Sequence, residues 1–535
     1  MTTKPPIAPD GAGIETTRRP AYIAFVLLEV FALPILLYLG RGRWFRYDEW
    51  DYLSTRSATS LHDLFAPHSV HWSTLPILTY RALWAVFGLH SYVPYQAVSI
   101  LAHLAVAALV RAVMRRAGVR PWTATGVVAL LVLFGAGEEN ILWAFQIAFT
   151  GALAFGLLQL ILADHDGPLD RRDTMGLLAG FAGLLCSGLA VTMVVVVGIA
   201  VLARRGWRIA AFHTAPLAVA YALWFLAIGH DGFGTEAQGG TSPGTVVSFV
   251  RAAVAAAFGR MAQVPGLGWA LGALVVVGCF LAWHNRSTNE LRRVAAAPVA
   301  LFVGAFVFLL ITGSGRGAGI ALASRYSYVV ASLVLPAIAI AAEAFMLRWR
   351  IATPILALAL ACAIVGNVRL FDNAGQQRAA DFQRAFREAF FLVPRLPIAS
   401  EMPRDFHPEI GLAPWVTLGW MRDGVAAGRI PSPGAVNAVT VSSAELQLAL
   451  KLQPNPHPDT CKLMAAPAHV RLTAKSSIQM SGALVIVYTD AAGVRSLAST
   501  FAPTRAARYL VAYAPLDLAV RSQSGKGTFR LCNSS

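Results

Sequence analysis

The chain has 535 residues, of which 56% are hydrophobic and only 13% charged, and its mean hydropathy is +0.57. Soluble globular proteins carry about 25% charged residues, so this composition excludes a soluble enzyme. The net charge of +16 would suit a nucleic-acid partner in a soluble domain. Here the polar loops are too short to form a continuous basic face along a phosphate backbone. We therefore expect a polytopic membrane protein that binds no nucleic acid.

Apolar segments of about 17–22 residues, long enough to cross a hydrocarbon core about 30 Å thick, recur along the chain. Residues 1–20 are polar, and the run 21–40 lacks a small-residue cleavage site, so we expect a cytoplasmic tail followed by a retained first span. Spans are predicted near residues 21–40, 92–113, 121–136, 142–163, 174–187, 189–203, 209–228, 267–284, 294–312, 326–346 and 351–366, about eleven in all.

The arginines of the short loops set the orientation. With the N-terminus inside, every cytoplasmic loop receives arginines, as at Arg115–Arg116 and Arg204–Arg205. This assignment leaves two moderately apolar segments, 74–89 and 246–262, as amphipathic helices on the outer interface. The alternative is that, of these two segments, 246–262 is an additional span. The C-terminal region would then lie inside.

An odd number of spans places residues 367–535 outside. A helical and Pro-rich connector is predicted over 367–434, with an amphipathic helix at 373–391. Residues 435–535 contain short alternating segments such as "ALVIVYTD" and "GTFRLCN", which are typical of strands, and they predict an extracytoplasmic β-sandwich. Cys461 and Cys532 are its only cysteines, and an oxidising compartment would allow them to form a disulfide.

The motif "WFRYDEWDYL" (44–53) directly follows the first span. It places Asp48, Glu49 and Asp51 beside Trp50 at the membrane surface. One interpretation is an interfacial aromatic belt with solvated acids. The other is a catalytic site, because acids near lipid are costly and neighbouring carboxylates raise one another's pKa, which suits a general base.

At this motif, and in the segment "HSVHWSTLPILTYRALWAVFGLHSYVPYQAVSILAHL" (68–104) that follows, the chain resembles the glycosyltransferase C superfamily of polytopic enzymes. The resemblance implies a transmembrane domain over 21–366 with a catalytic first external loop over 41–91. It also implies a polyprenyl-phosphate sugar donor and a place in cell-wall biogenesis at a bacterial cytoplasmic membrane. Asp48 is then the base, and Glu49 orients the acceptor or binds a divalent cation, although the motif does not decide whether a metal is used. Asp51 and Trp50 would contact the acceptor.

Two further motifs lie in predicted external loops. In "GEENILWAFQ" (137–146), Glu138, Glu139 and Gln146 are expected to contact the acceptor sugar, although acids at a helix N-terminus also complement the helix dipole. In "GSGRGAGIALASRYSY" (313–328), Arg316 and Arg325 suit a lipid-linked phosphate.

An Arg-Tyr pair that enters a late span also resembles the donor-phosphate region of the superfamily, and this adds Tyr326 to the predicted site. Snorkelling of the arginines is the alternative. His71 is expected to hydrogen-bond the same phosphate, or to be a plain surface histidine.

These features predict an inverting membrane glycosyltransferase. It would transfer one sugar from a polyprenyl monophosphate to an envelope glycan, lipid or protein on the external face. The main alternative is a flippase or transporter of lipid-linked saccharides, whose coupling groups usually lie within spans. A binding or scaffold protein for envelope assembly is a third alternative.

Overall fold

The computed structural model describes residues 11–232, 242–284, 286–316, 318–371, 374–408, 410, 412–454, 460–489 and 496–533. The chain divides into two compact units. The first comprises residues 1–43, 56–83 and 92–378, and the second comprises residues 44–55, 84–91 and 379–535. The first external loop is therefore shared between the units.

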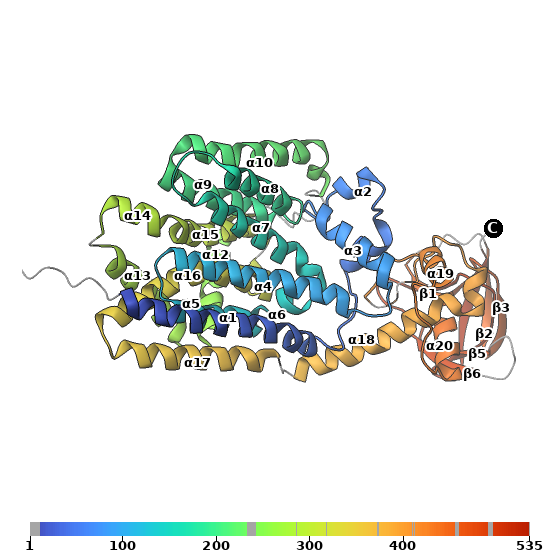
Figure 1. Ribbon diagram of the computed structural model, residues 1–535. Helices are drawn as coiled ribbons and strands as arrows, with labels where there is room; N and C mark the ends of the chain where they lie inside the picture. Colours follow the sequence, from blue (N-terminus) through green and yellow to red (C-terminus); the bar gives the residue numbers. More distant parts are fainter. Residues whose placement is uncertain are drawn as a thin grey trace, which may run out of the picture. The chain divides into compact units, whose positions relative to one another are not determined.

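The first unit is a bundle of long apolar helices that lie side by side (Figure 1). Its sequences are rich in Ala, Val and Leu, which allow helices to form and favour lipid or each other over water. The helices are α1 (Gly11–Leu39), α2 (Leu61–Phe65), α3 (Thr74–Phe87), α4 (Val93–Arg116), α5 (Pro121–Val132), α6 (Glu138–Leu142), α7 (Ile147–Ala163), α8 (Arg171–Leu184), α9 (Leu189–Arg205), α10 (Trp207–Ala227), α12 (Pro243–Ala262), α13 (Leu267–Trp283), α14 (Thr288–Val294), α15 (Ala296–Gly315), α16 (Ser324–Arg348) and α17 (Ala352–Phe371).

Eight of the described helices are long and apolar enough to cross a membrane, or up to nine if a bent pair is one span. This is consistent with a multi-pass membrane protein. A helix forms at each of the eleven predicted spans, but α5 and α8 have only 12 and 14 residues, and α7, α9 and α13 have 17 each. A helix of 14 residues is about 21 Å long, less than the hydrocarbon thickness.

Helix α12, which we expect to lie along the interface, meets the length and hydropathy criteria for a span. Two of its residues contact the first turn of its neighbour α16. The Phe249 ring lies 5.8 Å from that of Tyr326, and Arg260, eleven residues later, donates to Ser327 Oγ at 2.7 Å. Farther along α16, Val330 and Val334 line a small cavity together with Val254 and Phe258 of α12.

A sharp bend separates α5 from the short helix α6. The segments Pro121–Val132 and Gly135–Leu142 meet at 46°. Gly135 permits the bend to pack, because a Cβ atom there would lie 1.9 Å from the Asn367 carbonyl oxygen. The Asn367 side chain also accepts a hydrogen bond from Ala136 N at 3.1 Å. The bend carries the predicted motif 137–146 and holds it against α17.

In the second unit, residues Asp51–Thr55 form a short π-helical turn, and the connector contains α18 (Ala374–Leu392), α19 (Leu418–Ala426) and α20 (Ala438–Ala449). Nine strands follow: β1 (Leu450–Gln453), β2 (Thr460–Ala466), β3 (Ala468–Leu472), β4 (Ser477–Met480), β5 (Leu484–Thr489), β6 (Ser496–Phe501), β7 (Tyr509–Ala512), β8 (Leu516–Ser522) and β9 (Gly527–Asn533).

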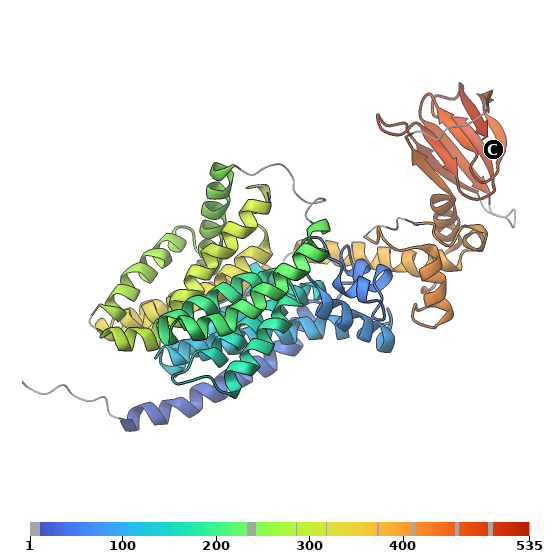
Figure 2. The same ribbon diagram turned by 90° about the horizontal axis from the view of Figure 1, so that it is seen from above.

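The strands form two antiparallel sheets, with the orders β1-β7-β4-β9-β2 and β3-β8-β5-β6. Figure 2 shows these C-terminal strands in orange to red. Alternate residues such as Ile478, Leu510, Ile486 and Val520 are fully buried, as expected for sheets with one face in a core. The predicted antiparallel sheet region is confirmed. The disulfide between Cys461 and Cys532 is also confirmed, and it joins directly opposed residues of β2 and β9.

Candidate functional site

The predicted catalytic acids lie in a tight turn of the second unit. Tyr47 has a φ of 47°, which turns the chain so that the Glu49 carboxylate accepts a hydrogen bond from Arg46 N at 2.9 Å. Glu49 is fully buried, whereas Asp48 is half-buried. The structure therefore gives Glu49 a part in holding the turn and leaves Asp48 the more accessible of the two acids.

Aromatic residues surround this turn. The Trp50 ring stacks on Phe390 of α18 with centroids 4.6 Å apart, and Trp44 meets both rings edge to face. The Trp44 amide also donates to Gln383 Oε1 at 2.7 Å. Trp50 is fully buried in this cluster. Trp50, which we expect to contact an acceptor sugar, thus has its ring face covered by Phe390. In this structure the Trp50 ring packs in the aromatic cluster.

Asp51 begins the π-helical turn that follows the cluster. Its backbone carbonyl accepts a hydrogen bond from Thr55 Oγ1 at 2.9 Å, and the same hydroxyl donates to its carboxylate. Asp51 is half-buried. Of the predicted acceptor contacts in this motif, it is the one whose side chain is partly accessible.

In the first unit, both acids of the motif 137–146 pair with arginines. The Glu138 carboxylate lies 2.5 Å from Arg43 Nη2, and the Glu139 carboxylate lies 2.8 Å from Arg325 Nη1. The Glu139 and Arg325 side chains are 18% and 25% exposed, so solvent screens their charges only in part. The structure thus brings together Glu139 and Arg325, which the sequence assigns to different substrates.

Arg325 and Tyr326 open helix α16. The Arg325 guanidinium lies 5.3 Å from the centroid of the Tyr326 ring, which packs between Phe249 of α12 and Phe308 of α15. Tyr326 is only 2% exposed. Its ring fixes the first turn of α16, so it supports Arg325 from the side facing α12 and α15.

A compact loop at residues 66–73 carries His71. His68 and His71 exchange two backbone hydrogen bonds of 2.9 Å, which is possible because Ser69 adopts a φ of 55°. Burial, followed by the electrostatic effects of Arg316, His68 and Arg325, lowers the pKa of His71 to about 3. His71 is therefore neutral at physiological pH, and its ring faces a region of positive potential.

Several buried polar atoms around this loop and around α6 lack a hydrogen-bond partner among the described residues. They are His71 Nδ1, Ser69 Oγ, Ser73 Oγ, Gln146 Oε1 and both amide atoms of Asn140. Each such group costs about 1–3 kcal/mol when its hydrogen bond is missing, so a concentration of them indicates a place for water or a polar ligand. Ser69 and Ser73 have no distinguishing pattern in the sequence, and sequence reasoning missed them.

An apolar groove of about 850 Å³ lies between α12, α13 and α15. Its lining includes Val254, Phe258, Trp269, Phe306 and Leu310. Two arginines also line it, Arg251 and Arg260.

Arg260 donates to Leu322 O and Ser327 Oγ, both at 2.7 Å. One arginine that lines the groove therefore contacts the segment 322–327, which includes Arg325.

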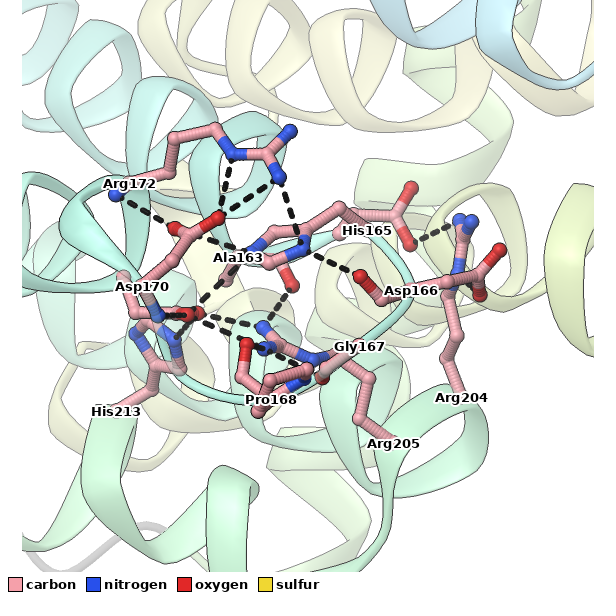
Figure 3. Close-up of polar contacts among 12 residues, drawn as sticks. Ala163, His165, Asp166, Gly167, Pro168, Asp170, Arg172, Arg204, Arg205 and His213 are labelled. Carbon is pink, nitrogen blue, oxygen red and sulfur yellow. Dashed lines mark hydrogen bonds and ion pairs between the residues drawn. The ribbon is translucent and has the colours of Figure 1, made fainter.

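A second polar cluster lies among α8, α9 and α10 (Figure 3). Asp173 is fully buried, and its carboxylate accepts hydrogen bonds from Arg205 at 2.5 and 3.1 Å. His213 Nε2 lies 2.9 Å from the same carboxylate. Burial opposes ionisation of Asp173, but the hydrogen bond from Arg205, followed by those from Asp170 N and His213, lowers its pKa.

This cluster is also the one group among the described residues whose geometry could hold a metal ion, through His165, Asp170 and Asp173. Both carboxylates are already neutralised by guanidinium groups: Arg172 binds Asp170 at 2.8 Å, and Arg205 binds Asp173. A divalent cation would have to displace these partners. The residues therefore fit a network of ion pairs, buried at Asp173 and exposed at Asp170, better than a metal centre.

The predicted site residues thus fall into two sets. Asp48, Glu49, Trp50 and Asp51 belong to the second unit, and His71, Glu138, Glu139, Gln146, Arg316, Arg325 and Tyr326 belong to the first. No model of a known protein family matches the chain, and no curated protein matches its sequence at a significant level.

Proposed function

We propose that the protein is a membrane glycosyltransferase that moves a sugar from a polyprenyl monophosphate to an envelope acceptor on the external face. The observation that carries this proposal is an apolar groove whose lining arginine, Arg260, contacts the segment that carries the partly accessible Arg325. A polyprenyl phosphate has the matching chemistry, a long apolar tail joined to an anionic head. A guanidinium group binds phosphate oxygens through paired, charge-assisted hydrogen bonds.

The neutral His71 supports the same role. A neutral imidazole can donate one hydrogen bond and accept another, so it can bind a phosphate or a sugar hydroxyl without adding charge. The unpartnered hydroxyls of Ser69 and Ser73 and the amide groups of Asn140 and Gln146 could bind sugar hydroxyls in the same way. Arg316 contributes to the positive potential at His71.

In the proposed reaction, Asp48 accepts the proton of the acceptor hydroxyl. The acceptor oxygen then attacks the anomeric carbon of the donor sugar, and the bond between that carbon and the phosphate oxygen breaks. The electron pair leaves with polyprenyl phosphate, whose added charge a cationic group stabilises. The attack and departure on opposite faces of the sugar invert the anomeric configuration.

The direct test is to incubate the purified protein with radiolabelled polyprenyl-phosphate sugars and envelope acceptors. Covalent transfer of label supports the proposal, and Asp48→Asn should abolish it while the protein stays folded. Full activity of Asp48→Asn would refute the assignment of the base. Parallel reactions with EDTA would show whether a divalent cation takes part.

A transporter of lipid-linked saccharides is the second candidate, and one observation favours it. Within the described part of the chain, Glu29 of α1 has a buried carboxylate oxygen without a hydrogen-bond partner, and His103 of α4 lies 2.8 Å from the Tyr328 hydroxyl. Ionisable groups inside spans often serve transport. In proteoliposomes, a transporter would move labelled donor across the bilayer without covalent transfer.

A further inference from the structure

One row of residues crosses the outer face of the five-stranded sheet in the second unit. The strand register places Gln453 opposite Tyr509, Tyr509 opposite Gln479, Gln479 opposite Arg530 and Arg530 opposite Leu463. Directly opposed residues share a face, so these five side chains point the same way from all five strands. The row covers four strand spacings, about 19 Å.

The opposite face of the same strands is the buried one. Ile478, Met480, Leu510 and Phe529 are between 0% and 3% exposed. Successive residues of a strand point to opposite faces, so Gln479, Tyr509 and Arg530 face away from this core. Arg530 is exposed, and the three other polar members of the row are partly exposed. The row is therefore accessible on the surface of the unit.

The row consists mainly of planar polar side chains that are held in place. Gln479 Nε2 donates to the Tyr509 hydroxyl at 2.9 Å, and Gln453 Nε2 donates to the Tyr513 hydroxyl. Each amide offers donors and an acceptor, and the tyrosine adds an apolar ring face beside its hydroxyl. These are the groups needed to bind an extended chain of rings that carry many hydroxyls.

The net charge of this region narrows the chemical class of the ligand further. Residues 450–535 contain ten lysine and arginine residues but only three aspartates, and four of the five lysines of the chain lie here. Such an excess of positive charge attracts anionic partners.

We infer that this face, the Gln453–Tyr509–Gln479–Arg530 row, binds an anionic polysaccharide that carries carboxylate or phosphate groups. Arg530 would pair with an acidic group, and the amides with Tyr509 would bind the neighbouring sugar rings. A lipid surface fits less well, because interfacial binding requires a broad apolar face and Leu463 is the only apolar member of the row. The inference concerns a second binding surface and does not depend on sugar transfer.

The test uses the full-length protein in nanodiscs of neutral lipid. Its binding is measured to polygalacturonate, which carries carboxylates, to phosphorylated dextran, which carries phosphates, and to unmodified dextran. Arg530→Ala should raise the Kd of at least one of the anionic polymers about tenfold, the loss expected for one charge-assisted hydrogen bond. Arg521→Ala is the matched control, because Arg521 is exposed on the outward side of β8 in the other sheet. It removes the same charge and should change the Kd less than twofold.

Three results would overturn the inference. Equal losses in Arg530→Ala and Arg521→Ala would show diffuse charge attraction, and equally tight binding of unmodified dextran would show that charge plays no part. Binding of phosphatidylglycerol vesicles through Arg530 would assign the surface to a membrane. If Arg530→Ala fails to fold, Gln479→Glu tests the same row, because a negative charge there should abolish binding of both anionic polymers.

Discussion

Glu139 and Arg325 allow a test in which two partners of one ion pair have opposite effects. Arg325→Ala removes the guanidinium that we propose to hold the donor phosphate, so it should weaken donor binding. Glu139→Gln removes the carboxylate that occupies the same guanidinium at 2.8 Å. A phosphate would then bind Arg325 without first displacing an acid, so donor binding should become stronger.

The expected sizes follow from the partly buried geometry. A hydrogen bond to a charged group contributes about 1.5–3 kcal/mol, so Arg325→Ala should weaken binding about 10- to 150-fold. A partly exposed ion pair contributes at most about 1 kcal/mol, so Glu139→Gln should strengthen binding by no more than about fivefold. Glu138→Gln is the matched control, because Glu138 pairs with Arg43 instead, and it should change affinity less than twofold.

The assay is calorimetric titration of the detergent-solubilised protein with farnesyl phosphate, in the absence of any acceptor. Omitting the acceptor separates donor binding from any contact between Glu139 and an acceptor sugar. Equal weakening by Arg325→Ala and Glu139→Gln would show that the pair is structural, and it would refute the reasoning. Unchanged affinity in both variants would place the phosphate elsewhere.

Three further predictions concern stability. Asp173→Asn should lower the free energy of unfolding by about 3 kcal/mol, because it leaves the buried Arg205 without its carboxylate partner. The stability that the Asp173 carboxylate contributes is present above the pKa of the unfolded carboxyl and is lost as the pH falls. Thermal unfolding of the protein and the variant at pH 7 and pH 3 would measure this loss. Replacing Cys461 and Cys532 by Ser should lower the free energy of unfolding by about 2–4 kcal/mol, which unfolding with and without a reductant would show. Donor binding, measured by the same titration, should stay unchanged. Trp50→Ala should lower the free energy of unfolding by about 3–5 kcal/mol, and Trp50→Phe should lower it clearly less. Equal melting temperatures for the two variants would contradict the packing role of this ring.

Much of the candidate site could be located from the sequence but not assembled. The motifs 44–53, 137–146 and 313–328 were recognisable because charged residues stand out in an apolar chain. Their partners were not, since Glu139 and Arg325 are 186 residues apart and Trp50 packs on Phe390. Hydropathy reports the preference of a segment for lipid or water, and it contains no information about which distant side chain lies opposite.

The sequence by itself located the apolar helices, the antiparallel sheet region and the Cys461–Cys532 disulfide. These follow from local quantities: the length of an apolar run, alternation with a period of two, and two cysteines in one region. Only the tertiary structure decided that Trp50 packs on Phe390, that Glu139 pairs with Arg325 and that Gly135 lies against the Asn367 carbonyl. Each of these depends on packing between segments far apart in the chain, where close contact and paired polar groups determine which arrangement is stable.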